Sequence, residues 1–145
     1  MSSMSVMSIM QNESFASSFT ASAIVCHLIG DYVVQSDRMA VDKTSKSLWA
    51  ALHAVTYTAS FLLVTRNLLA LLFIAGTHFI IDRWRLARYV CWAKNAIGGS
   101  YAPWSECSAT GYHKDRPAWL AVWLLIICDN TMHLCCNAVA MWTWP

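Results

Sequence analysis

The sequence predicts an all-α membrane protein with four transmembrane helices and both termini outside the cytoplasm. Hydrophobic residues make up 57% of the 145 residues and charged residues only 12%, about half the ~25% charged fraction of soluble domains. Four apolar stretches approach the ~20 residues that a membrane-spanning helix needs. Lysine and arginine are concentrated in two connections between these stretches. Together these observations exclude a soluble domain of this size.

The predicted spans follow one another along a single four-helix domain. They cover residues 15–35, 47–65, 67–84 and 118–140. The first and third are less apolar than the others because they contain histidine and aspartate. The domain covers residues 15–140 and includes a connection at about 85–117 before the last span. It is preceded by an N-terminal tail or interfacial segment, 1–14, and followed by a short tail, 141–145.

The positive charges orient these spans. The segment before the first span contains no lysine or arginine, and the connection between the second and third contains only Arg66. The other two connections contain the remaining nine basic residues. Because cytoplasmic loops are enriched in lysine and arginine, both connections are expected in the cytoplasm of a multi-pass protein of the bacterial inner membrane. A net charge of +2 without a compact basic run predicts no nucleic-acid partner.

Histidine and aspartate recur inside the apolar stretches at helical spacing. Three pairs are separated by four residues and a fourth stretch contains one histidine: His27 and Asp31, His78 and Asp82, Asp129 and His133, and His53. Residues four apart lie on the same face of a helix. A charged residue inside a membrane costs roughly 2.5–3.5 kcal/mol on the insertion scale. Histidine or aspartate nevertheless occurs in all four segments, which indicates one shared polar site between the helices.

The composition of this site predicts a metal centre. Seven nitrogen and oxygen donors exceed what one tetrahedral zinc ion needs and suit two ions about 3.5–4 Å apart. Without cysteine, the set favours a hydrolytic zinc, manganese or iron site, with zinc preferred and one or two ions expected. All seven residues are candidate ligands, and Asp31, Asp82 and His53 are also candidate catalytic residues. Tyr57, Asn137 and Gln35, each four residues after a candidate ligand, are candidate hydrogen-bond partners of these ligands.

Basic residues crowd the predicted cytoplasmic ends of the spans. Four are candidate substrate-binding residues: Arg83, Arg85, Lys43 and Arg116. They would meet an ester or phosphoester of a lipid headgroup at this depth, although basic residues in these positions also serve as anchors of orientation.

The candidate ligands are predicted at different depths in the membrane. Measured along each span from its cytoplasmic end, Asp129 and His133 lie about two turns deeper than the others. Tilt, or a fourth helix that begins outside the hydrocarbon, would remove the difference.

Three segments resemble one known family. They are His27-Leu-Ile-Gly-Asp-Tyr-Val-Val-Gln-Ser-Asp-Arg-Met-Ala40 followed by Lys43, Thr77-His-Phe-Ile-Ile-Asp-Arg-Trp84, and Asp115-Arg-Pro with Asp129-Asn-Thr-Met-His-Leu134. Together they resemble the DUF3307 family of bacterial and phage membrane proteins, over about residues 27–137. The pattern is also similar to that of integral-membrane metal-dependent hydrolases, which array histidine and aspartate on several spans. This resemblance implies a membrane location and a metal, and it identifies no activity within the family.

Three functions fit these observations. The first is an intramembrane metal-dependent hydrolase of a lipid or lipid-linked ester or phosphoester. The second is a small transporter or channel subunit that passes a proton or divalent ion, and the third is a non-catalytic interaction protein with a structural metal. The apolar outer halves of the spans disfavour a path through the membrane. In each case four short spans bury a small core, which predicts a homo-oligomer.

Overall fold

The computed structural model describes residues 21–145, and every regular element within them is helical. The all-α fold class is therefore confirmed. The predicted interfacial segment, 1–14, and the first residues of the first predicted span lie outside the described residues. In order, the elements are Ala21–Val33, which ends in the π-helical turn η1 (Ile29–Val33), α2 (Asp37–Asp42), α3 (Ser47–Ser60) with its 3₁₀ extension η2 (Phe61–Leu63), α4 (Leu68–Trp84), α5 (Leu86–Ile97), α6 (Trp104–Cys107) and α7 (Ala118–Thr143).

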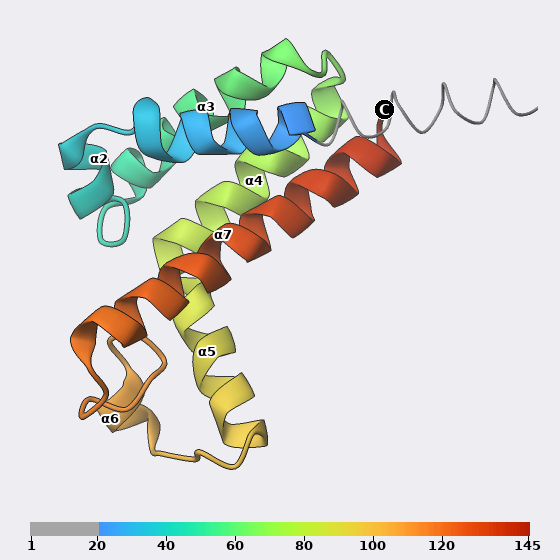
Figure 1. Cartoon of the computed structure of the whole chain (residues 1–145). Coiled ribbons are helices and arrows are strands. Elements are labelled where there is room, and N and C mark those ends of the chain that lie inside the picture. Colours follow the sequence, from blue (N-terminus) through green and yellow to red (C-terminus); the bar gives the residue numbers. More distant parts are fainter. Residues whose placement is uncertain (1–20) are drawn as a thin grey trace, which may run out of the picture.

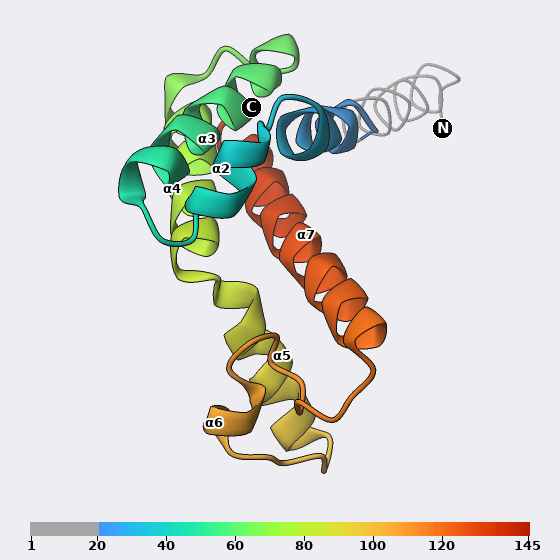
Figure 2. The same cartoon turned by 90° about the vertical axis from the view of Figure 1, so that its left-hand side faces the viewer.

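Two pairs of helices make up the main body (Figure 1). The first helix packs on α3 through η1, and α4 packs on both α3 and α7. The short α2 lies against α3 at the end where the first helix stops. Figure 2 shows α5 continuing beyond the end of α4, beside the first turns of α7, with α6 and its loops at the far end. The two pairs of helices therefore meet along α4, which lies between α3 and α7.

Local sequence signals explain where the helices begin and end. The side chain of Ser36 accepts a hydrogen bond from the backbone N–H of Met39 at the start of α2, and that of Asn67 accepts one from Leu69 at the start of α4. Such caps satisfy N–H groups that have no partner within the helix. Arg85 ends α4 in the left-handed region, with φ 51°. Since a left-handed residue cannot continue a right-handed helix, the chain turns there into α5.

Helix length separates α7 from the other helices. Among the described residues, only α7 is long and apolar enough to cross a membrane. Ala21–Val33 and Ser47–Leu63 are apolar but shorter. At 1.5 Å per residue, the seventeen residues of Ser47–Leu63 extend about 25 Å, less than the ~30 Å hydrocarbon layer. The structure therefore identifies one helix of spanning length where the sequence predicts four spans.

The interior divides into an apolar end and a polar end. Near η2, the apolar core consists of Cys26, Tyr57, Phe61, Ala70, Ile74, Ala140 and Met141. Toward α2, the buried side chains are mainly histidine and aspartate. All six cysteines are free. Burial raises the pKa of the Cys91 thiol to about 11, which keeps it a neutral packing group.

Candidate metal centre

Four buried side chains from three helices form the first group of potential metal ligands. Asp31 comes from η1, His53 from α3, and His78 and Asp82 from α4. None is more than 8% exposed. One donor atom of each residue lies within 4.8 Å of the corresponding atoms of the other three. The structure therefore brings together the pair His78 and Asp82, the aspartate of the first pair and the single histidine of the second span.

The donor spacing in this group matches tetrahedral coordination. His53 Nε2 lies 3.2 Å from Asp31 Oδ1 and 3.4 Å from Asp82 Oδ2. His78 Nε2 lies 3.4 Å and 3.1 Å from the same two oxygens. Around a tetrahedral zinc ion with ligands at about 2.0–2.1 Å, neighbouring donors lie about 3.3–3.4 Å apart. These four donors can therefore bind one ion with little movement.

A second group shares Asp82 with the first. His133 Nε2 lies 3.5 Å from Asp82 Oδ1 and 3.4 Å from Asp129 Oδ2. The two oxygens of Asp82 thus face different groups: Oδ2 faces His53 and His78, and Oδ1 faces His133. A carboxylate that offers one oxygen to each of two ions is a usual bridge in two-metal sites.

Buried nitrogens without hydrogen-bond partners provide a further test of this interpretation. His78 Nε2 and His133 Nε2 are buried and make no directed hydrogen bond, although carboxylate oxygens surround them. Buried polar atoms are normally paired, because an unpaired one costs about 1–3 kcal/mol. A divalent ion accepts a lone pair from each donor and resolves both cases. The residues therefore fit a metal, and their nitrogen and oxygen donors suit zinc, manganese or iron.

The π-helical turn and a glycine position Asp31. Gly30 lies in η1, and a Cβ there would come 2.5 Å from Tyr57 Cδ2 and 3.1 Å from Tyr57 Cα. The absence of a side chain lets the first helix approach α3 closely at this level. Single π-helical turns often occur at functional sites, where they redirect a side chain. Here Asp31 points toward the histidines of α3 and α4.

The position of α7 along α4 removes the difference in depth expected from the sequence. Cys128 Sγ contacts the carbonyl of Ala87, at the start of α5. The first turns of α7 therefore lie beside α5, beyond the end of α4. One residue later, Asp129 is level with the last turn of α4, which places His133 against Asp82. The fourth helix therefore begins well beyond the end of the third, so all three pairs occupy the same level.

His27 lies outside both donor groups, because both of its ring nitrogens have hydrogen-bond partners. Asn137 Nδ2 donates to the Tyr57 hydroxyl at 2.6 Å, and that hydroxyl donates to His27 Nδ1 at 2.8 Å. His27 Nε2 donates in turn to Asn130 Oδ1 at 2.8 Å. His27 Nδ1 is also 3.6 Å from Asp31 Oδ2. This network ties the first helix to α3 and α7 around the candidate ligands.

Sequence reasoning identified part of this network. Tyr57 is hydrogen-bonded to the candidate ligand His27 and not to His53, four residues before it, and Asn137 is hydrogen-bonded to Tyr57 and not to His133. Gln35 Oε1 has no hydrogen-bond partner. Asn130 was missed because residues adjacent in a helix face different directions, and Asp129 alone was expected to face the site. The amide of Asn130 also donates to the Tyr32 hydroxyl at 2.6 Å.

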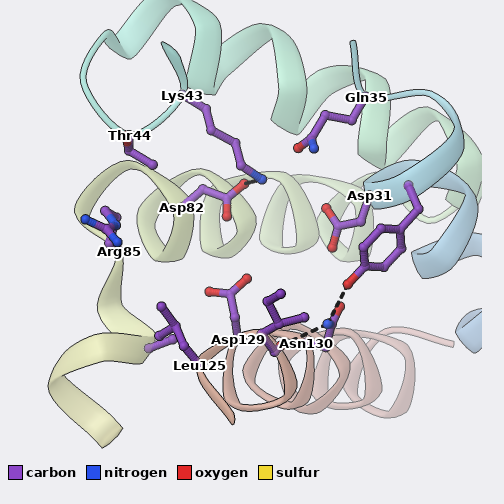
Figure 3. Close-up of a pocket in the computed structure, with 12 residues that line it drawn as sticks. Asp31, Gln35, Lys43, Thr44, Asp82, Arg85, Leu125, Asp129 and Asn130 are labelled. Carbon is purple, nitrogen blue, oxygen red and sulfur yellow. Dashed lines mark hydrogen bonds and ion pairs between the residues drawn. The ribbon is translucent and has the colours of Figure 1, made fainter. Parts of the chain in front are cut away.

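A pocket of about 220 Å³ opens beside the two donor groups. Figure 3 shows the carboxylates of Asp31 and Asp82 on one side and Asp129 of α7 opposite them. The ammonium of Lys43 lies 2.9 Å from Asp82 Oδ2, and Arg85 is near the end of the pocket formed by Thr44. Apolar lining comes from Ala87, Leu125 and Ile126. The pocket thus combines three carboxylates that could bind a metal, two cationic side chains and an apolar wall.

Residues 19–144 match the family model described as a protein of unknown function, DUF3307. The chain belongs to the DUF3307 family. No curated protein and no solved structure matches it. Each of the three segments that resemble DUF3307 contributes one histidine–aspartate pair to the polar end, and His53 comes from the helix between the first two.

Arg83 and Arg116, the other two predicted substrate-binding residues of the DUF3307 chain, do not line the pocket beside the donor groups. The guanidinium of Arg83 donates to the Thr44 carbonyl at 2.9 Å and to Ser47 Oγ at 3.1 Å, which joins the end of α4 to the start of α3. Arg116 lines a second pocket of about 200 Å³, with Tyr112 and His113. Of the four predicted residues, the structure therefore places Lys43 and Arg85 at the candidate metal centre.

Proposed function

We propose that the protein is a metal-dependent membrane hydrolase that acts on a lipid or lipid-linked phosphoester or ester. The observation that carries this proposal is Asp82, whose two oxygens belong to two donor groups beside one pocket. Two-metal centres occur in hydrolases of esters and phosphoesters, such as phosphatases and nucleases. The pocket also contains Lys43 and Arg85, which suit an anionic substrate.

Charge supports divalent ions as the cofactor. Asp31, Asp82 and Asp129 bring three negative charges to the centre, and Lys43 brings one positive charge. Buried carboxylates need a compensating cation. One divalent ion neutralises the remaining charge, and a second makes the centre positive, as an anionic substrate requires. Zinc is the first choice because the spacing of the first group is tetrahedral, and manganese or iron are the alternatives.

The chemistry follows from the arrangement of the carboxylates. When bound, such ions polarise the substrate ester and lower the pKa of a coordinated water to about 7. Asp31 uses Oδ1 in the first donor group, while Oδ2 lies 3.6 Å from His27. Since Asp31 also lines the pocket, its second oxygen is available as a general base. His53 is fully buried behind the carboxylates and acts as a ligand in this proposal.

Exposed apolar surface supports a location in the bacterial inner membrane. Only 11% of the most apolar window of α7 is buried within the molecule. Large apolar side chains are also exposed on the first helix, α3 and α4: examples are Val25, Leu48, Val55, Leu68 and Leu72. In water such a surface would favour aggregation. In the proposal these helices contact lipid as four spans, with the connections in the cytoplasm and homo-oligomer contacts covering part of the surface.

The apolar end of the interior favours a hydrolase over a transporter. Phe61, Ile74 and Met141 fill the space between the helices on the side away from the metal centre, and all are at most 5% exposed. Passage of a proton or ion to the other face of the membrane would require polar groups there. The candidate centre instead opens on one side, through the pocket beside Asp129 and Arg85.

Metal content and hydrolysis together test the proposed function. Detergent-purified protein, prepared without chelator, is expected to contain one or two equivalents of zinc, manganese or iron by elemental mass spectrometry. The His78→Ala/Asp82→Ala variant should lose them, and the Arg66→Ala control, an exposed residue far from the centre, should keep them. Metal-loaded protein should hydrolyse phospholipids in mixed micelles. Stoichiometric metal without hydrolysis of any lipid ester would indicate a structural site, and absence of metal would reject the proposal.

A further inference from the structure

The two donor groups differ in the number of donors and in the exposure of their carboxylates. The first group has four donors and the second has three, one of which is shared. We propose that the centre holds two unequal ions: a tightly bound ion in a closed site, and an exchangeable ion in an open site that binds a phosphate group of the substrate. This inference rests on the proposed function and assigns its substrate class.

The closed site consists of Asp31, His53, His78 and Asp82. All four side chains are buried, and the four histidine–carboxylate distances of 3.1–3.4 Å already match a tetrahedron. Four protein donors complete the coordination of a tetrahedral ion and leave no position for substrate. Because the donors come from three helices, an ion there also holds these helices together. Slow exchange and high affinity are the expected consequences.

The open site consists of Asp82, Asp129 and His133. Its histidine is buried, with an unpartnered Nε2, but the side chain of Asp129 is 32% exposed. Three protein ligands and one free position are the usual arrangement of a catalytic zinc ion. Asp82 and Asp129 line the pocket, as does Asp31 of the closed site, and Asp129 is the most exposed of these three carboxylates. The free position therefore faces the pocket.

The surroundings of the open site indicate a phosphate group. Lys43 and Arg85 line the same pocket, so an anion at the free position would meet one ion and two cationic side chains. The neutral carbonyl of a carboxylic ester would make little use of these charges, whereas the oxygens of a phosphoester pair with all three. Arg85 has a left-handed backbone, φ 51°, which is rare for residues other than glycine and is concentrated at functional sites.

Zinc stoichiometry distinguishes the two sites. Chelator-stripped wild-type protein, titrated with zinc and analysed by elemental mass spectrometry, is expected to bind two equivalents with affinities at least about tenfold apart. Asp129→Asn should bind one equivalent at the higher affinity, because all four donors of the closed site remain. His78→Ala should lose the high-affinity equivalent. Asp42→Asn is the matched control: its carboxylate pairs with Lys46 and Arg38, away from the centre, and it should bind two equivalents.

Substrate class is tested on the same proteins. Zinc-loaded wild-type protein should hydrolyse a phosphoester lipid analogue at least about tenfold faster than the matched carboxylic ester, and inorganic phosphate should bind only when two equivalents are present. The inference would be overturned if wild-type protein bound two equivalents of zinc with equal affinity or only one equivalent, or if Asp129→Asn bound two. Each of these results would leave the proposed metal-dependent hydrolase in place. A preference for the carboxylic ester would overturn the substrate class. Wild-type protein that binds no metal would reject the proposed function itself.

Discussion

The ammonium of Lys43 lies 2.9 Å from Asp82 Oδ2 and 3.2 Å from His53 Nε2. Asp82 Oδ2 and His53 Nε2 are both donor atoms of the proposed closed site, so the lysine and a metal ion would compete for the same lone pairs. Like charges repel at this distance. We therefore expect Lys43 to leave these two atoms when the ion binds and to turn into the pocket, which it already lines, where it can contact the substrate anion.

Replacing Lys43 with methionine should strengthen metal binding and weaken substrate binding. Methionine has a similar length but no charge to compete with the ion. The zinc dissociation constant of the closed site, measured by competition with a coloured chelator, should fall at least about tenfold, while KM for a phosphoester should rise. Lys46→Met is the control, because Lys46 pairs with Asp42 outside the centre. Weaker zinc binding in Lys43→Met would mean that the lysine supports the ligands.

Tyr57→Phe should destabilise the fold while keeping the aromatic stack on His78, whose ring centre is 3.7 Å from that of Tyr57. The lost hydroxyl leaves His27 Nδ1 and the amide of Asn137 without their partner. A buried unsatisfied group costs about 1–3 kcal/mol. Circular dichroism in detergent should show earlier thermal unfolding. Tyr89→Phe, which removes the hydroxyl of an exposed side chain that accepts only from Arg88, should unfold at the wild-type temperature; an equal loss in both variants would contradict the proposed network.

Alanine at two helical glycines should have opposite effects. A Cβ at Gly30 would overlap Tyr57, at 2.5 Å from Cδ2, whereas one at Gly76 would meet nothing within 4 Å. Overpacking costs about 1–3 kcal/mol, and alanine is favoured over glycine within a helix by about 1 kcal/mol. Gly30→Ala should therefore unfold at a lower temperature than wild type and bind zinc more weakly. Gly76→Ala should unfold at the same or a higher temperature. Wild-type behaviour of Gly30→Ala would show that the two helices are farther apart.

Arg85→Gly should reduce activity with little change in stability. Glycine removes the cost of the left-handed backbone, about 1–2 kcal/mol for other residues, and also removes the hydrogen bond from Arg85 to the Ala109 carbonyl, worth about 0.5–1.5 kcal/mol. These effects nearly cancel. Activity on a phosphoester should fall at least about tenfold, through a higher KM. Arg83→Ala should instead lower stability, because Arg83 holds Thr44 and Ser47. Full activity in Arg85→Gly would remove this arginine from the substrate site.

Much of the candidate centre follows from spacing within single helices. Pairs such as His78 and Asp82, four residues apart, must lie on one face wherever the chain is helical. The apolar residues around them predict burial, and burial of charge predicts a partner or a metal. Helix boundaries are also local: Asn67 and Pro117 are signals that depend only on neighbouring residues, and α4 and α7 begin directly after them.

By itself, the sequence determined the all-α class, the helices and the residue types that the centre contains, because these depend on contacts within about four residues. Only the tertiary structure decided which donors meet. Asp31 joins His53 and His78, while its sequence neighbour His27 pairs with Tyr57 and Asn130. This choice depends on the rotation and offset of whole helices. Close packing at Gly30 and the start of α7 beyond the end of α4 set that offset, and no local pattern specifies either.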